Sequence, residues 1–189
     1  MTESEDASFE RLLQFLQQQR GFDFNGYKRP SLMRRIERRM QLAGVEGFDP
    51  YVDYLEVHPE EYVQLFNTVL INVTSFFRDD AAWDYLKSDV VPQLLSSKGP
   101  HDPVRIWSAG CASGQETYSI AMVFAEVLGA EAFRERVKVY GTDADEEALT
   151  QARLASYTQK ELDTVHPELV QRYFEPQGTR YVYRPDLRR

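Results

Sequence analysis

Two neighbouring segments of this chain have the residue types of a site for an adenosine-bearing ligand. Residues 105–122 read RIWSAGCASGQETYSIAM, an apolar stretch followed by a turn between Gly110 and Gly114. A second apolar stretch, residues 137–142, is followed directly by Asp143. Strand, glycine turn, helix, strand and acid make up half of a nucleotide-binding unit, in which glycines let the backbone approach the ligand and the acid binds the ribose hydroxyls. The spacing therefore predicts that Gly110 and Asp143 face a bound adenosine.

The residues after the turn distinguish between cofactors. A P-loop has Lys and then Ser or Thr after its last glycine, whereas Gln115 and Glu116 follow Gly114 here. The dinucleotide pattern G-x-G-x-x-G is absent as well. A carboxylate at a helix N-terminus would repel a pyrophosphate but could pair with an ammonium group. S-adenosylmethionine (SAM), which has an adenosine, a sulfonium and an amino-acid tail, fits this turn. An ordinary α/β turn, with Glu116 as a helix-start charge, is the alternative.

An upstream segment, residues 72–79 (NVTSFFRD), carries an arginine beside two aromatic rings. Phe76 and Phe77 are expected to be buried anchors. The guanidinium of Arg78 is planar and always charged, which suits a carboxylate. We therefore predict that Arg78 binds a carboxylate at the site. A surface ion pair with a neighbouring aspartate is the alternative.

Two acids follow the second apolar stretch, and only one of them can bind the ribose. Asp143 comes immediately after the apolar residues and is the better candidate, whereas Asp145 is expected to cap the helix that follows. Cys111 has no neighbouring histidine, so we interpret it as a small residue that permits a tight turn. Trp107 and Tyr118 are expected to belong to the core.

Residues 31–43 predict an amphipathic helix with a strongly basic side. One side carries the apolar residues Leu32, Met33, Ile36 and Met40. The other carries Arg34, Arg35, Arg38 and Arg39. In a protein of net charge −8, this concentration of positive charge predicts docking on an acidic partner rather than a merely solvated face. Nucleic acid is the competing partner, but the net charge and the lack of aromatic residues on that face argue against it.

Helical spacing, prolines and glycines indicate the elements that position these residues. The first part of the chain reads as a helix that ends before Gly21, followed by helices at 30–43, 51–57, 60–70 and 81–95. A breaker-rich loop, 96–100, precedes alternating strands and helices at 104–108, 116–128, 137–142 and 146–155. Short helical turns at 159–162 and 168–174 and one further element at 180–184 follow. The pattern predicts a helical domain at 1–80, a linker at 81–100 and an α/β domain at 101–189.

Three motifs, in this order, resemble the CheR family of chemotaxis receptor glutamate O-methyltransferases. They are NVTSFFRD at 72–79, IWSAGCASGQETYS at 106–119 and GTDAD at 141–145. The segment SLMRRIERRM at 31–40 is similar to the basic helix of that family's N-terminal domain. The resemblance runs from about Phe9 to Arg189. It implies a small helical domain followed by a Rossmann-like SAM-dependent methyltransferase domain, a fold of α plus α/β class.

The resemblance also implies an activity and a set of site residues. The activity is methylation of glutamate side chains on chemoreceptors, with SAM converted to S-adenosylhomocysteine. Asn72, Thr74 and Arg78 match residues that line the family's cofactor site, and the arginine is expected to be catalytic because it lies near the transferred methyl group. With Gly110, Glu116 and Asp143 they make up the expected cofactor-binding set. The basic helix is expected to face the acidic methylation helices of chemoreceptors.

The methyltransferase sheet of the family has seven strands, and this chain predicts two parallel strands and one further element. We therefore expect either a piece of a longer protein or a fold completed by another polypeptide, with the 189-residue chain inactive alone and self-associating or poorly stable. A small β-subdomain of the family is expected beyond Arg189. A docking or SAM-sensing module without turnover, and a methyltransferase for another substrate, are the alternatives.

Composition excludes several other classes. The single cysteine excludes an internal disulfide and favours a reducing, cytoplasmic setting. With three scattered histidines, it gives no metal-ligand spacing, so no metal is expected. The acidic N-terminus does not read as a signal peptide, and no apolar run approaches the roughly 20 residues that would span a bilayer. The net charge of −8 argues against general nucleic-acid binding.

Overall fold

The computed structural model describes residues 3–21, 23–24, 26–70 and 72–188. The chain divides into two compact units, Met1–Ile71 and Asn72–Arg189. This boundary comes earlier than the predicted one after residue 80. The reason is that Phe76 is fully buried in the second unit, where its ring packs edge-on against Tyr157 and Phe174 at centroid distances of 4.9 and 5.6 Å.

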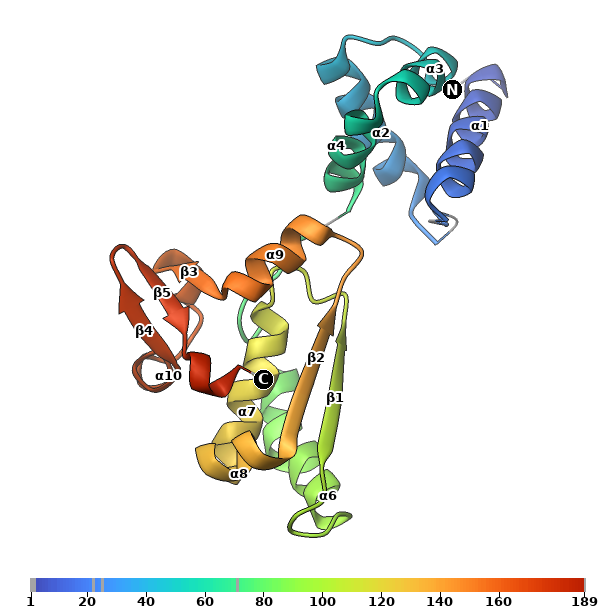
Figure 1. The fold of residues 1–189 in the computed structure, drawn as a ribbon. Coiled ribbons are helices and arrows are strands. Elements are labelled where there is room, and N and C mark those ends of the chain that lie inside the picture. The colour runs from blue at the N-terminus through green and yellow to red at the C-terminus, as the bar shows by residue number, and fades with distance from the viewer. Residues whose placement is uncertain (1–2, 22, 25, 71, 189) are drawn as a thin grey trace. The chain divides into compact units, whose positions relative to one another are not determined.

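The first unit is helical, as predicted. Its helices are α1 (Glu3–Arg20), α2 (Arg29–Ala43), α3 (Phe48–Val57) and α4 (Pro59–Val69) (Figure 1). Prolines at the first turns of α2 and α4 fit because the missing N–H has no intrahelical partner there. Gly44 ends α2 in the left-handed conformation, at φ 70°. The predicted apolar side of α2 is confirmed, since Leu32, Ile36 and Met40 are buried.

The second unit begins with a helical stretch and a parallel strand pair. In chain order its elements are α5 (Asp80–Tyr85), the π-helix η1 (Leu86–Val90), α6 (Val91–Ser96), β1 (Val104–Ala109), α7 (Gln115–Leu128), α8 (Ala130–Arg136), β2 (Val137–Thr142) and α9 (Glu146–Leu154). Strands β1 and β2 pair in parallel over their whole length, from Val104↔Val137 to Ala109↔Thr142. The predicted strands are confirmed, and α8 is an element that the sequence pattern did not indicate. Because α6 and η1 pack on α7, the predicted linker belongs to this unit.

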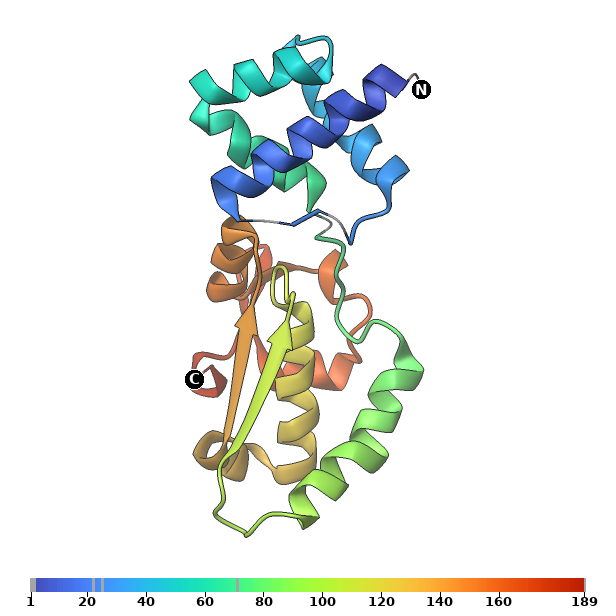
Figure 2. The same ribbon diagram turned by 90° about the vertical axis from the view of Figure 1, so that its right-hand side faces the viewer.

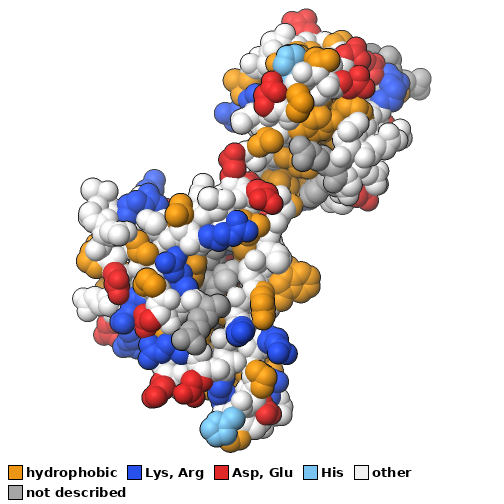
Figure 3. All heavy atoms as spheres, viewed as in Figure 1, with side chains coloured by type: hydrophobic (Ala, Val, Ile, Leu, Met, Phe, Trp, Pro, Cys, Tyr) orange, Lys and Arg blue, Asp and Glu red, His pale blue; other side chains and the backbone are white. Residues whose placement is uncertain are grey.

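Helix α7 covers one face of the strand pair (Figure 2). On the other face, Trp107 and Tyr140 are cross-strand neighbours with exposed fractions of 71% and 49%. The expectation that Trp107 belongs to the core is therefore wrong. Successive side chains of a strand point to opposite faces, so Trp107 points away from the face that carries buried Ser108. Figure 3 shows hydrophobic side chains at the surface in this part of the second unit.

The last part of the chain forms a second, separate sheet. Its elements are β3 (Ser156–Thr158), η2 (Lys160–Leu162), α10 (Pro167–Tyr173), β4 (Phe174–Gln177), β5 (Arg180–Tyr183) and η3 (Pro185–Leu187). The three strands are antiparallel, in the order β3-β5-β4. The two predicted helical turns are present. The sequence pattern indicated one further element at 180–184 but no antiparallel sheet, because the strands here have three or four residues and show little alternation in the sequence.

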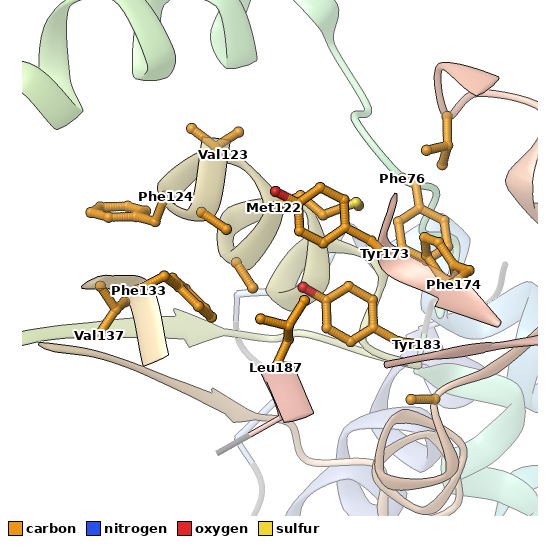
Figure 4. Packing of buried hydrophobic residues seen from close by; sticks show 14 of the residues in the cluster. Phe76, Met122, Val123, Phe124, Phe133, Val137, Tyr173, Phe174, Tyr183 and Leu187 are labelled. Atoms are coloured by element: carbon orange, nitrogen blue, oxygen red, sulfur yellow. The ribbon is translucent and has the colours of Figure 1, made fainter. Parts of the chain in front are cut away.

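The core of the second unit joins the small sheet to α7 (Figure 4). Met122 of α7 is fully buried, and Tyr173, Phe174 and Tyr183 pack into the same cluster. The rings of Tyr173 and Tyr183 are stacked, with centroids 6.2 Å apart and an interplanar angle of 9°. Tyr118 packs against this core from α7, as expected. The aromatic cluster therefore fixes α7 from the side opposite to the strands.

Candidate functional site

The glycine turn lies at the carboxyl ends of β1 and β2, where ligands bind in open α/β sheets. The N–H groups of Gly110 and Cys111 both donate to the carbonyl oxygen of Thr142, at 2.7 and 3.0 Å. Gly114 has φ 92°, and a Cβ there would lie 2.9 Å from the Cβ of Ala152. Only glycine therefore fits where the turn enters α7. Cys111 is buried, and burial raises the pKa of its thiol, which agrees with its interpretation as a small turn residue.

Asp143 is half-buried directly after β2 and is bound to the turn by its carboxylate. Its Oδ2 accepts the N–H of Ala112 at 2.7 Å, and its Oδ1 accepts the N–H of Asp145 at 2.9 Å. Each carboxylate oxygen can accept more than one hydrogen bond. Both oxygens of Asp143 therefore keep the capacity to accept ribose hydroxyls while their positions are fixed by backbone donors.

Asp145 caps α9, as predicted. Its Oδ1 accepts the N–H groups of Glu147 and Ala148 at 2.8 and 2.9 Å, and its Oδ2 accepts the side-chain amide of Asn72. The residue is 4% exposed. Because this carboxylate already has three donors and lies in the interior, Asp143 is the better candidate for the ribose.

The 72–78 segment lies against the first turns of α7 and α9. Asn72 donates to Asp145 at the start of α9, and the N–H of Phe77 donates to the Oγ of Ser119 on α7 at 3.1 Å. The hydroxyl of Thr164 donates to the carbonyl oxygen of Phe76 at 2.9 Å. These contacts place Asn72 beside Asp145, two residues after Asp143, and Phe77 beside α7.

Arg78 is exposed at the end of this segment, with Nη1 donating to the carbonyl oxygen of Val73 at 3.1 Å. Among the described residues it forms no ion pair with Asp79 or Asp80, the alternative considered for it. The residues on either side are in the left-handed region, Phe77 at φ 50° and Asp79 at φ 63°. Residues other than glycine rarely adopt this backbone conformation, and such strain concentrates at functional sites.

Glu116 and Thr74 are the remaining predicted cofactor residues. Glu116 is exposed in the first turn of α7, and its Oε1 accepts the hydroxyl of Ser108 at 2.7 Å. Ser108 is 2% exposed at the end of β1, so a buried hydroxyl orients this carboxylate. Thr74 is half-buried in the 72–78 segment. Sequence reasoning missed Ser108, although the alternation of β1 places it on the side facing α7.

A second missed contact supports the turn from the small sheet. The hydroxyl of Tyr157 on β3 donates to the carbonyl oxygen of Ser113 at 2.9 Å. Burial raises the pKa of this phenol, so it remains a donor throughout the ordinary pH range. No local sequence pattern could have indicated a contact between residues this far apart in the chain.

Both units match one protein family. Residues 72–189 match the SAM binding domain of CheR methyltransferases, and residues 7–70 match the all-alpha domain of the same family. The chain belongs to the CheR methyltransferase family. The matched domains follow the division into compact units at residue 71.

Curated relatives include chemotaxis protein methyltransferases. The chain is 33% identical to that of Salmonella typhimurium over 171 residues, which cover 89% of this chain and 56% of the relative. It is also 33% identical to that of Escherichia coli, over 89% of this chain and 57% of the relative. An uncharacterized 104.1 kDa protein of Rhodobacter capsulatus is 29% identical over 94% of this chain and 19% of its own length. The chain spans a little over half the length of these chemotaxis relatives.

The residues present in this CheR chain fit SAM, the cofactor that its matched domain binds. Asp143 is acceptor-only and retains capacity for the ribose hydroxyls. Glu116 offers a carboxylate for the ammonium of the amino-acid tail. A Cβ added at Gly110 would have no atom within 4 Å apart from its chain neighbours, so a ligand can approach the backbone there. When bound, SAM would supply the methyl group.

The basic side of α2 in the all-alpha domain separates into two parts. Arg34 and Arg38 are exposed, and Arg35 is half-buried with Nη1 donating to the carbonyl oxygen of Val69 at 3.0 Å. These three arginines line a hollow of about 700 Å³ together with Glu37, Gln41 and Thr68. Arg39 instead forms an ion pair with Glu61 inside the domain, and its side chain is 18% exposed. The candidate docking surface is therefore Arg34, Arg35 and Arg38 without Arg39.

The described part of the chain holds no cluster of His, Cys, Asp and Glu residues that could bind a metal ion. Within the same residues, every helix is too short or too polar to cross a bilayer.

Proposed function

We propose that this chain takes part in SAM-dependent methylation of glutamate side chains on chemoreceptors in the cytoplasm. The observation that carries the proposal is the hydrogen-bonded junction of three segments. Asn72 from the first segment reaches the start of α9, and Asp143 after β2 binds the glycine turn at Ala112. This junction supports the proposal because it lies at the carboxyl ends of two parallel strands, the position at which such folds bind ligands.

The chemistry needs positioning more than proton transfer. A glutamate carboxylate with a pKa of about 4.3 is already ionised near neutrality, so no general base is required. One carboxylate oxygen forms a bond to the methyl carbon as the bond from that carbon to sulfur breaks, and the product is a methyl ester. Asp143 would hold the ribose and Glu116 the ammonium group. Arg78 would orient a carboxylate at the reacting centre, either that of SAM or that of the substrate.

The all-alpha domain would supply the docking surface. Arg34, Arg35 and Arg38 line one hollow, and only Glu37 among its lining residues opposes their charge. Acidic helices of a receptor fit this surface because their carboxylates match guanidinium donors. Such exposed charges attract a partner over about 8 Å at physiological ionic strength, so binding would weaken as salt is added.

Two measurements test the proposal. Calorimetry should detect binding of SAM and S-adenosylhomocysteine, and Asp143→Ala should weaken it by roughly ten-fold to a hundred-fold through loss of hydrogen bonds to a charged group. Glu146→Gln, a charge-removing control on α9, should bind normally. Transfer of a labelled methyl group from SAM to receptor glutamates should depend on Asp143 in the same way. Unchanged affinity in Asp143→Ala would rule out the assigned ribose contact.

A docking or SAM-sensing module without turnover is the second candidate. The exposed face of β1 and β2, with Trp107 and Tyr140 at the surface, is the observation in its favour. A methyltransferase site works best when water is excluded. Because this exposed face lies beside the carboxyl ends of the strands, water would reach the candidate site and disfavour methyl transfer. Binding of SAM and receptor with no labelled ester formed would support this candidate over catalysis.

A further inference from the structure

Asp145 links two of the candidate cofactor residues. Its side chain accepts the amide of Asn72, and its backbone N–H donates to the carboxylate of Asp143 at 2.9 Å. We propose that Asp145 is a positioning residue of the cofactor site, which orients Asn72 and Asp143 together without touching the ligand. This inference rests on the proposed function and extends it to a residue outside the cofactor-binding set.

Asp145 fixes the direction of the Asn72 side-chain amide. An ionised carboxylate only accepts hydrogen bonds, so the Nδ2 of Asn72 must face Asp145 and its Oδ1 must face away. Without this partner the exposed side chain could rotate and exchange the two atoms. The bond therefore presents a fixed acceptor, suited to an ammonium group or a hydroxyl of the ligand.

Asp145 is itself held by hydrogen bonds at the start of α9. It is 4% exposed, and its Oδ1 accepts both Glu147 and Ala148 at the start of α9. These bonds fix the side chain and, with it, the direction of the backbone N–H that reaches Asp143. Asp145 thus holds the side chains of Asn72 and Asp143 in a fixed orientation relative to each other. Less conformational entropy is then lost when a ligand binds.

A role as helix cap alone would explain the contacts of Asp145 within α9. A serine substitution separates this capping role from the positioning of Asn72. Serine is as good a cap as aspartate, so Asp145→Ser should preserve the helix start. Its side chain is shorter and has one oxygen, which cannot accept the α9 N–H groups and also reach Asn72. Glu146→Gln is the matched control, because it removes one negative charge from the same helix turn and leaves Asn72 bonded.

The test is a double-mutant cycle read by calorimetry with S-adenosylhomocysteine. We expect Asp145→Ser and Asn72→Ala each to weaken binding about tenfold, and the double variant to lose about tenfold rather than the hundredfold of independent sites. Thermal unfolding of Asp145→Ser should stay close to that of the unsubstituted protein. In the ligand-free protein, the two side-chain amide proton signals of Asn72 should move in Asp145→Ser and stay unchanged in Glu146→Gln.

The outcomes separate this inference from the proposed function. Normal affinity in Asp145→Ser, or losses that multiply in the double variant, would overturn the positioning role. In that event a loss in Asp143→Ala would leave the proposed function standing. No binding of S-adenosylhomocysteine by the unsubstituted protein would overturn both.

Discussion

The guanidinium of Arg39 donates two hydrogen bonds to the carboxylate of Glu61, at 2.5 and 2.6 Å, and joins α2 to α4. The hydroxyl of Tyr51 on α3 donates to the same carboxylate at 2.7 Å. Three helices of the first unit therefore meet at one acid, whose side chain is 6% exposed. Arg39 therefore holds α2 in place within the unit, whereas Arg34 and Arg38 on the same helix remain exposed.

Arg39→Ala should destabilise the first unit. It leaves the buried carboxylate of Glu61 without its cation, which costs about 3 kcal/mol for a pair of this kind. Urea unfolding followed by circular dichroism measures the loss. Arg38→Ala, a neighbouring arginine with an exposed side chain, should change stability little. Equal effects of the two substitutions would contradict the internal role of Arg39.

The same pair predicts a dependence of stability on pH. Burial alone would raise the pKa of Glu61, but hydrogen bonds from Arg39 and Tyr51 outweigh it and lower the pKa below the ordinary 4.5. A carboxyl with a lowered folded pKa stabilises the fold above its unfolded pKa and loses that contribution as pH falls through the folded pKa. Unfolding free energies should therefore fall below about pH 4.5, and Glu61→Gln should flatten this fall.

Charge reversal on the docking surface should separate binding of the receptor from binding of the cofactor. Arg34→Glu with Arg38→Glu should abolish receptor docking, because both side chains are exposed and line the basic hollow. Affinity for SAM should remain. Arg105→Glu on β1 makes the same kind of charge change on an exposed residue of the second unit and should leave docking intact. Docking by the unsubstituted protein that does not respond to salt would argue against this surface.

Arg78→Ala should lower methyl transfer more than it lowers cofactor affinity, since its planar donors are proposed to orient a carboxylate at the reacting centre. Arg78→Lys should recover little, because an ammonium group cannot bind a carboxylate through two parallel hydrogen bonds. Single-turnover rates and calorimetry measure the two effects. Equal losses would make Arg78 a cofactor anchor, and no loss in either would leave it a surface charge.

Ser108→Ala should weaken SAM binding about fivefold, the equivalent of one neutral hydrogen bond of about 1 kcal/mol. The reason is that the buried hydroxyl of Ser108 orients Glu116, which is proposed to meet the ammonium group. Calorimetry with S-adenosylhomocysteine measures the change. If the double variant with Glu116→Gln and Ser108→Ala loses no more affinity than Glu116→Gln alone, the serine acts through the glutamate.

Features set by neighbouring residues were predictable from the sequence, and features set by distant contacts were not. Asp145 could be identified as a cap because it directly precedes a helix of acidic first-turn residues. Helical spacing placed Arg39 on the basic side of α2 but could not reveal Glu61, which comes from a separate helix. The contact of Tyr157 with the glycine turn depends in the same way on packing of the small sheet beside that turn. Trp107 is different, because strict alternation along β1 would have placed it opposite Ser108.

The indole hydrogen bonds of the chain's two tryptophans have a practical consequence. Trp83 donates to the carbonyl oxygen of Arg78 at 2.6 Å, and Trp107 donates to the hydroxyl of Thr142, beside Asp143, at 2.8 Å. Each fluorophore therefore reports on a different wall of the same candidate site. Intrinsic emission, resolved with Trp83→Phe and Trp107→Phe, would follow the arrival of a ligand at each wall without any attached dye.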